Sequence, residues 1–235
     1  MLPKIKAPIY DVEIPSKKKM IKVRPFEVKE ERILLMARQG GEVADFFAAM
    51  SQITQNCILD EGIDVLKLPL FDVEYLFTRI RAVSVSDISK VQYQDQEDGK
   101  TYSFDIELNK IEVKFPEDVS PKFKVNQDIS FTLKYPPMSV YTTKEFFDLD
   151  EDGVFNKLLA TCLDKVFSGG VVHDASEYKS EEIVAFVDQL PAKFYTEIRK
   201  FFTNLPSLYN ELTYTNANGK EQKIVQRTVE DFFTF

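Results

Sequence analysis

Catalysis near neutral pH needs groups that exchange protons, and histidine is the usual one. This chain has a single histidine, His173, which follows the pair Gly169-Gly170 and precedes Asp174. A Ser-His-Asp site of the hydrolase type needs a nucleophile in a turn such as G-x-S-x-G, and the sequence contains no such turn. His173 is therefore interpreted as a residue of a loop or short strand that has no catalytic role.

A second group of candidate residues is acidic. Asp148, Asp150, Asp152 and Gly153 form the pattern D-x-D-x-D-G, which matches the start of a calcium-binding loop. A complete loop also needs a bidentate glutamate at its twelfth position, which here is Leu159. We expect these carboxylates to lie at the start of a helix, where they suit its positive end, with a weak cation site at Asp148–Asp152 as the alternative.

The remaining motifs argue against metal and cofactor chemistry. Cys57 and Cys162 each occupy an apolar helical position, which predicts two reduced thiols in the core. Two separate cysteines and one histidine do not make the paired C-x-x-C pattern of a zinc ribbon. The sequence has no Walker loop and no G-x-G-x-x-G pattern. We therefore predict no catalytic residues, no cofactor and no metal.

The composition narrows the class of partner. The 235 residues are 44% hydrophobic, enough for a folded core, and carry a formal net charge of −8. Phosphate backbones repel an acidic protein, so nucleic acid is disfavoured as a partner. No window has the roughly 18 apolar residues of a membrane span, and the first ten residues resemble neither a signal peptide nor an anchor. We expect a soluble protein made in the cytosol.

Hydrophobic periodicity along the chain predicts both helices and strands. Alternating residues predict hairpins near both ends of the chain, with the run Lys17-Lys18-Lys19 at the tip of the first and Asn218-Gly219 in the turn of the second. Helical spacing is found over residues 29–39, 43–57, 69–85, 143–147, 155–167, 180–190 and 191–202. Alternation from Ser89 to Tyr135 predicts one small antiparallel sheet inserted between helices. A short helix at residues 229–233 is expected to dock through Phe232 and Phe233.

The predicted fold class is α+β, a helical body with an inserted small antiparallel sheet and N- and C-terminal β-hairpins. Along the chain we expect an N-terminal hairpin (1–28), a helical part (29–88), an inserted β part (89–137), a second helical part (138–210) and a C-terminal hairpin with a short helix (211–235).

Three stretches together resemble a known family. They are VRPFEVKEERILLMA at residues 23–37, LPLFDVEYLFTRIRAVSV at residues 68–85, and FFTNLPSLYNE at residues 201–211 with DFF at 231–233. In order and spacing they resemble the baseplate hub subunit and hub-assembly family of T-even-type phages across nearly the whole chain. The second stretch is the most specific of the three.

The resemblance implies a non-enzymatic structural or assembly subunit of a contractile-tail baseplate hub, which acts by binding other baseplate and hub proteins. It also implies assembly in the host cytoplasm, a place in the virion tail and possible homo-oligomers through the baseplate symmetry. Many family members carry C-x-x-C zinc ribbons in their hairpins. The corresponding turns here, residues 94–100 and 215–219, have no cysteine. We therefore expect these hairpins to hold by strand pairing and packing alone.

Within this function, two roles remain open: a subunit of the finished particle, or an assembly chaperone of the hub that is absent from the mature virion. An acidic-site hydrolase and a nucleic-acid adaptor are alternatives from other classes.

Aromatic and arginine residues are common anchors of protein interfaces. The expected partner-binding residues lie on the helix at 69–85 and at the C-terminal end of the chain: Phe71, Glu74, Tyr75, Arg79, Arg81, Phe232 and Phe233.

Overall fold

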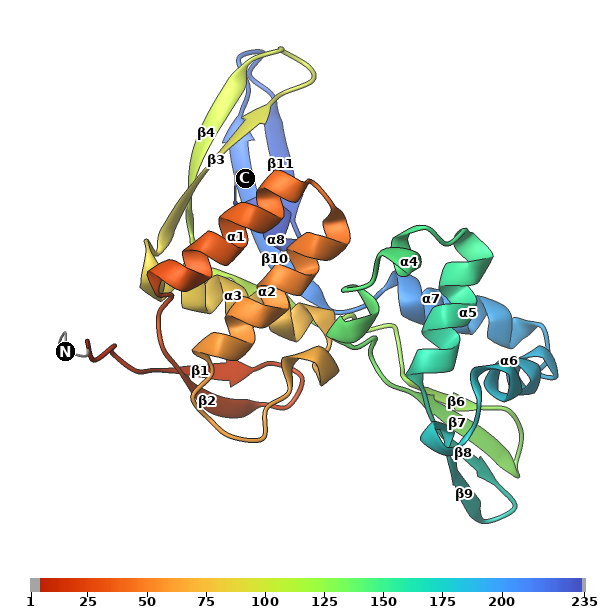
Figure 1. The fold of residues 1–235 in the computed structure, drawn as a ribbon. Helices are drawn as coiled ribbons and strands as arrows, with labels where there is room; N and C mark the ends of the chain where they lie inside the picture. The colour runs from red at the N-terminus through yellow and green to blue at the C-terminus, as the bar shows by residue number, and fades with distance from the viewer. Residues whose placement is uncertain (1–4, 234–235) are drawn as a thin grey trace. The chain divides into compact units, whose positions relative to one another are not determined.

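The computed structural model describes residues 5–233, and they form two compact units. Unit 1 combines Met1–Lys114 with Ser207–Phe235, so it is built from both ends of the chain. Unit 2, Phe115–Pro206, is inserted between them. Both units contain helices and antiparallel strands, which confirms the predicted α+β class (Figure 1).

Unit 1 consists of three main helices, a short C-terminal helix and three small sheets. Its elements, in chain order, are β1 (Tyr10–Ile14), β2 (Lys19–Val23), α1 (Val28–Gly40), α2 (Val43–Cys57), η1 (Val65–Lys67), α3 (Leu70–Ser84), β3 (Ile88–Gln94), β4 (Thr101–Glu107), η2 (Leu108–Lys110), β5 (Glu112–Lys114), β10 (Ser207–Thr215), β11 (Glu221–Gln226) and α8 (Val229–Phe232).

Helix α3 lies at the centre of unit 1. It packs against α2, β1, β5 and β10, so apolar residues on more than one side of it are buried. Val73, Leu76, Phe77 and Ile80 have no solvent exposure. Burying side chains of this size stabilises a fold by about 1.5–3 kcal/mol each, so α3 is the main apolar anchor of the unit.

A polar contact fixes the N-terminal hairpin to the same helix. Asp72, in the first turn of α3, accepts hydrogen bonds from the backbone N–H of Ser16, at 2.9 Å, and from the Ser16 hydroxyl. Ser16 belongs to the turn between β1 and β2. The contact thus joins residues 56 positions apart and sets the position of the hairpin on α3.

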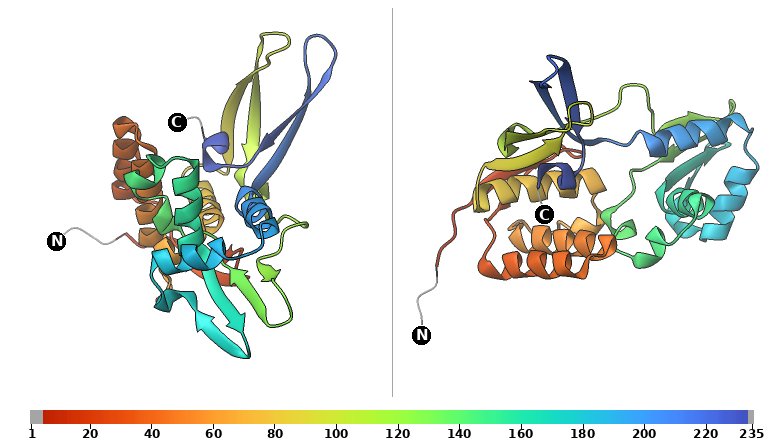
Figure 2. Two further views of the ribbon diagram at one scale, coloured as in Figure 1. Left: turned by 90° about the vertical axis from the view of Figure 1, so that its right-hand side faces the viewer. Right: turned by 90° about the horizontal axis from the view of Figure 1, so that it is seen from above.

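Two further hairpins extend from the helices of unit 1. β3 pairs with β4, and β10 pairs with β11 on one side and with β5 on the other. Figures 1 and 2 show the β3–β4 and β10–β11 hairpins projecting together beyond the helices. The predicted C-terminal hairpin and the short helix after it are therefore present.

Unit 2 is a four-stranded antiparallel sheet with helices on one face. Its elements are β6 (Lys122–Lys124), β7 (Ile129–Leu133), η3 (Met138–Val140), α4 (Lys144–Phe147), α5 (Glu151–Cys162), β8 (Leu163–Ser168), β9 (Val171–Asp174), η4 (Ala175–Glu177), α6 (Ser180–Asp188) and α7 (Lys193–Thr203). The sheet order is β6-β7-β8-β9. Phe131 of the sheet and Phe194, Ile198 and Phe201 of α7 belong to one apolar core between the two layers.

The structure corrects the prediction of one inserted sheet between Ser89 and Tyr135. β3 and β4 form a sheet of their own, β5 joins β10, and β6 and β7 join the later strands β8 and β9. Alternation along a strand specifies which face is buried but carries no information on the partner strand. Alternation therefore predicted that these residues form strands, but the predicted pairing of the strands is wrong.

The helix expected at residues 155–167 is also corrected. α5 begins at Glu151 and ends at Cys162, after which residues 163–168 form β8. Gly169 and Gly170, with φ of 56° and 81°, form the tight turn into β9. This left-handed conformation suits glycine and two-residue hairpin loops, so the glycine pair marks a hairpin and does not end a helix.

Candidate protein-interaction surfaces

The structure places four of the seven expected partner-binding residues in the interior. Phe71 and Glu74 are 3% and 6% exposed, and Phe232 and Phe233 are 0% and 9% exposed. Tyr75, Arg79 and Arg81 keep part of their surface in solvent. Because α3 is packed on several sides, most of its aromatic surface belongs to the core. Only Tyr75, Arg79 and Arg81 of the expected residues on this helix are exposed enough to contact a partner.

The C-terminal residues attach α8 to the rest of unit 1, as the sequence predicted. The ring of Phe233 meets that of Phe77 edge-on, with centroids 6.2 Å apart. The hydroxyl of Ser89 donates to the carbonyl of Phe232 at 2.5 Å. Phe232 and Phe233 thus tie the end of the described chain to α3 and β3.

Glu74 lies in the same contact and carries a perturbed carboxyl. It accepts a hydrogen bond from the backbone N–H of Val229 at 3.4 Å. Burial raises the pKa of Glu74 to about 8, since removal from water disfavours the charged form, and the nearby Glu230 and Asp231 add to the rise. A carboxyl of this kind is largely protonated at neutral pH and serves packing of α8 against α3.

Arg79 is occupied by contacts inside unit 1. Its guanidinium donates to the backbone carbonyls of Asn109, at 2.5 Å, and Ile111, at 3.3 Å. It also lies over the ring of Tyr75, 4.9 Å from the centroid. Arg79 therefore holds the segment that leads from η2 into β5, and most of its donor capacity is used there.

Arg81 and Phe233 instead border open grooves beside α1. One groove, of about 700 Å³, is lined by residues that include Leu35, Arg38, Val43 and Phe233. A second, of about 210 Å³, is lined by residues that include Leu35, Arg81 and Phe233. Arg81 and Phe233 thus contribute to a surface centred on α1, a helix for which the sequence predicted no partner-binding residue.

Exposed apolar side chains line these grooves or neighbour a lining residue in the chain. Leu35 and Val43, which line them, are 46% and 48% exposed, and Met36, which follows Leu35 in α1, is 64% exposed. With Arg81 and Phe233 they make up what we call the α1 surface. Isolated exposed apolar residues are ordinary, but a group of them around a groove is typical of a binding surface.

A buried ion pair anchors α1 beneath this surface. Glu30, which has no solvent exposure, accepts from both terminal nitrogens of Arg24, at 3.0 and 3.3 Å, and from the N–H of Glu27 at 2.8 Å. Although burial acts to raise it, these hydrogen bonds lower the pKa of Glu30 below its ordinary value. Leu34 is the one apolar residue of α1 that is buried, so this polar anchor carries much of the attachment.

The tips of the two projecting hairpins are joined by a polar cluster that the sequence did not predict. Asp95 accepts a hydrogen bond from the phenol of Tyr214 at 2.8 Å. Glu97 forms an ion pair with Lys220 at 2.5 Å, and Asp98 accepts from the N–H of Ala217 at 2.8 Å. The expectation that pairing and packing alone hold these hairpins is therefore wrong, because charged side chains bridge their turns.

Each turn of this tip cluster is also organised internally. Asp95 accepts from the N–H of Glu97 at 2.7 Å, and Asn216 accepts from the N–H of Lys220 at 3.0 Å. Below the tips, the rings of Tyr102 and Tyr214 lie 4.7 Å apart, so an aromatic contact continues the join. The two turns have similar sequences, D-Q-E-D-G-K at residues 95–100 and N-A-N-G-K at residues 216–220. This similarity is the feature of the sequence that could have indicated a contact between the two hairpins.

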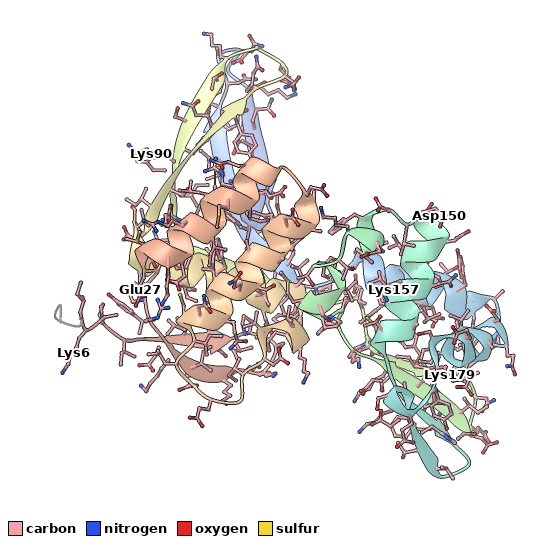
Figure 3. The ribbon with its side chains drawn as sticks, in the orientation of Figure 1. Lys6, Glu27, Lys90, Asp150, Lys157 and Lys179 are labelled. Carbon is pink, nitrogen blue, oxygen red and sulfur yellow. The ribbon has the colours of Figure 1, made fainter. Side chains whose placement is uncertain are left out.

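The residues considered for catalysis are placed in unit 2. His173 lies in β9, and its Nδ1 is 2.8 Å from the hydroxyl of Tyr178. Asp150 is the N-cap of α5 and accepts from the N–H of Gly153 at 2.8 Å, which agrees with the expected helix start; Figure 3 labels it at that position. Within residues 5–233, no three histidine, cysteine, aspartate or glutamate side chains are grouped so that they could hold a metal ion.

The two cysteines are buried, one in each unit. Cys57 and Cys162 are both free thiols, as the sequence predicted. Burial raises the pKa of each to about 12, because the thiolate is poorly solvated in an apolar interior.

Among the described helices, none is long and apolar enough to cross a membrane.

Comparison with known proteins gives one family. A family model described as T4 bacteriophage base plate protein matches residues 7–234, nearly the whole chain. No curated protein and no solved structure gave a significant match. The match includes both units and the α1 surface, the buried α3–α8 contact and the paired hairpins, and the chain belongs to the T4 bacteriophage base plate protein family.

Proposed function

We propose that this baseplate protein is a subunit of the hub of a contractile phage tail and that it acts by binding neighbouring baseplate proteins, without catalysis. The family match over residues 7–234 is the observation that carries the proposal. The same family supports a place in the virion tail. The finer assignment to the hub rests on the resemblance of residues 23–37, 68–85 and 201–211 to hub proteins.

The α1 surface is the proposed contact with a neighbouring hub protein. Leu35 and Val43 expose apolar area in grooves that Arg81 and Phe233 also line, and Met36 exposes further apolar area beside Leu35 in the chain. Burying such side chains in a complex removes apolar surface from water, and a nearby arginine can pair with a partner's carboxylates. Of the residues expected from sequence, Arg81 and Phe233 are the two that would take part.

A co-expression pull-down with the other hub proteins of the same phage tests this proposal. The chain should retain a specific hub protein, and the double substitution Leu35→Ser with Met36→Ser should abolish that retention. Leu66→Ser is the matched control, because Leu66 is 44% exposed but lies in η1. If a soluble, folded chain retains no hub protein, the proposal fails. If Leu66→Ser reduces the retention as much as the double substitution does, the α1 surface is not the contact.

The role within the hub is decided by a different measurement. A structural subunit should be found by mass spectrometry in purified phage particles in proportion to its neighbours, whereas an assembly chaperone should be absent from them. We propose the structural role. Absence of its peptides beside abundant hub peptides would assign the chaperone role instead.

The absence of catalysis is tested by complementation. A variant in which His173, Asp148, Asp150 and Asp152 are all replaced by Ala should still support assembly of infectious particles. If this variant folds but fails to complement a phage that lacks the gene, a chemical role for these residues would have to be considered again.

A further inference from the structure

Helix α8 is a short element that a small number of contacts hold to unit 1. The apolar side chains that it and the next residue bury are Val229, Phe232 and Phe233. Gln226 donates a hydrogen bond to the carbonyl of Asp231 at 2.6 Å, and the hydroxyl of Ser89 donates to the carbonyl of Phe232. The side chains of Gln226 and Ser89 do not ionise, so these two contacts do not depend on pH.

Glu74 supplies a contact between α3 and α8 that can ionise. Its buried carboxyl accepts from the N–H of Val229 at 3.4 Å, which is long for a hydrogen bond. The charged groups that act on it are Glu230 and Asp231 of α8, and both are acidic. From α2, β1, η2, β5 and β10, which also pack against α3, no cation among the described residues acts on this carboxyl. Glu74 is thus buried beside two other acids with no positive charge to balance it.

A carboxylate at this position is unfavourable in the docked state. Burial removes water from the charge, and Glu230 and Asp231 repel it, so the pKa of Glu74 rises from 4.5 to about 8. The docked form therefore holds a proton that is lost once water reaches the carboxyl. Docking that depends on this proton is fully present below pH 4.5 and is lost as the pH rises through 8. Within that range the equilibrium constant for release should increase about tenfold per pH unit.

Movement of α8 relieves this cost more easily than unfolding of unit 1 does. The hydrogen bond to Glu74 and the charges that act on it come from residues 229–231, so departure of α8 admits water to the carboxyl. Release exposes the few apolar side chains of a four-residue helix, whereas α3 carries the main apolar core. Segments with few buried contacts open locally before the whole protein unfolds. We therefore expect α8 to leave while α3 stays in place.

Release of α8 also alters the α1 surface. Phe233 directly follows α8 and lines both grooves beside α1, and Leu35 and Arg38 line both as well. Glu230 of α8 lines the larger groove. When α8 leaves, both grooves lose part of their wall, and the α1 surface loses the aromatic ring of Phe233.

We propose that α8 is a latch on the α1 surface: ionisation of Glu74 releases α8 from α3 and withdraws Phe233 from both grooves. A rise in pH should then weaken the binding of a hub protein at this surface. The effect on binding rests on the proposed function of the α1 surface, whereas the release of α8 does not.

Hydrogen exchange of the full chain from pH 5 to pH 8 tests the release. After correction for the intrinsic exchange rate at each pH, the protection of residues 229–233 should fall about tenfold per pH unit. That of β3 and β4 should stay constant. In Glu74→Gln the protection of α8 should not depend on pH, and Glu221→Gln, an exposed change in β11, should behave like the parent. Protection of α8 that is independent of pH in the parent overturns the latch, and so does an equal loss in β3 and β4.

Repeating the hub pull-down at pH 5.5 and pH 8 tests the consequence for binding. The parent should retain less of the hub protein at pH 8, and Glu74→Gln should retain the same amount at both values. If α8 is released but the parent retains the hub protein equally at both values, release does not control the α1 surface. If no hub protein is retained even at pH 5.5, the proposed function fails, and the hydrogen-exchange result still stands as the test of the latch.

Discussion

The carboxylate of Asp95 and the phenol of Tyr214 meet at 2.8 Å, although 119 residues separate them in the chain. Asp95 is in the turn between β3 and β4, and Tyr214 is in β10, so this hydrogen bond joins the two projecting hairpins. Burial together with the neighbouring Asp95 raises the pKa of Tyr214 to about 12, so the phenol stays protonated and able to donate throughout the neutral range. This hydrogen bond therefore helps to hold the two projecting hairpins together.

Replacing Tyr214 with Phe should loosen this join. The substitution removes the hydroxyl and leaves Asp95, which is 5% exposed, with one donor fewer. We expect a lower midpoint in urea denaturation and faster hydrogen exchange of the amides in both hairpins. Tyr209→Phe is the matched control in the same strand, because its phenol donates to the exposed Glu211. If Tyr209→Phe changes the urea midpoint and the hydrogen exchange as much as Tyr214→Phe does, the Asp95–Tyr214 hydrogen bond is not what joins the hairpins.

Breaking the ion pair beneath α1 should have a large effect. Arg24→Met leaves the fully buried carboxylate of Glu30 without its guanidinium, and removing one partner of a buried pair costs about 3–5 kcal/mol. Because the pKa of Glu30 is lowered in the folded state, the stability it provides is present above its ordinary pKa and is lost as the pH falls through the lowered value. Urea denaturation at neutral and acid pH measures both effects.

A second substitution and a control sharpen this test. Arg24→Met combined with Glu30→Leu removes both charges and should recover part of the lost stability. Lys22→Met breaks an exposed pair with Asp11 and should cost no more than about 1 kcal/mol. If Lys22→Met and Arg24→Met destabilised the protein equally, the anchoring role of Glu30 would be refuted.

The buried carboxyl of Glu74 should make stability fall as the pH rises. Its folded-state pKa of about 8 lies above the ordinary value of 4.5, so the folded protein binds a proton that the unfolded chain releases between these two values. Unfolding is therefore favoured progressively from pH 4.5 to 8, by a total on the order of a few kcal/mol.

Replacing Glu74 with Gln should remove this pH dependence. Gln has the same shape and an oxygen that can accept from Val229, but it does not ionise. We expect Glu74→Gln to be more stable than the parent at pH 8 and nearly equal at pH 4.5, in thermal or urea unfolding followed at both values. Glu221→Gln, an exposed change in β11, is the control, because Glu221 is not one of the carboxylates that raise the pKa of Glu74. The stability difference between Glu74→Gln and the parent should therefore be larger at pH 8 than at pH 4.5. If the difference is the same at both values, the raised pKa of Glu74 is ruled out.

Asp150 should act as a helix cap and not as a calcium ligand. Its side chain accepts from the N–H of Gly153, and loss of such a cap costs about 1 kcal/mol, so Asp150→Ala should lower the stability of unit 2 by that amount. Asp152→Ala, inside the first turn of α5, should have a smaller effect. Calcium or a chelator should leave the melting temperature of the parent unchanged; a clear rise with calcium would instead support the incomplete loop.

Local sequence patterns determined much of what was found. Alternation around Val12 and Ile14 predicted the first hairpin, Asn218-Gly219 predicted the turn of the last one, and the apolar spacing of Val73, Phe77 and Ile80 predicted α3. The docking of Phe232 and Phe233 was also foreseen. These features depend on residues within a few positions of each other, where backbone geometry fixes the spacing of buried side chains.

Only the tertiary structure decided which of these elements meet. β5 pairs with β10 across about ninety residues, α3 is packed on several sides so that its aromatic residues are core, and the turns at residues 95–100 and 216–220 exchange hydrogen bonds and an ion pair. An alternating or helical pattern specifies which side of an element is buried, but it carries no information on which distant element covers that side. The partner is selected by the combined packing of the whole unit, and the exposure of Leu35, Met36, Val171 and Val172 follows from that selection.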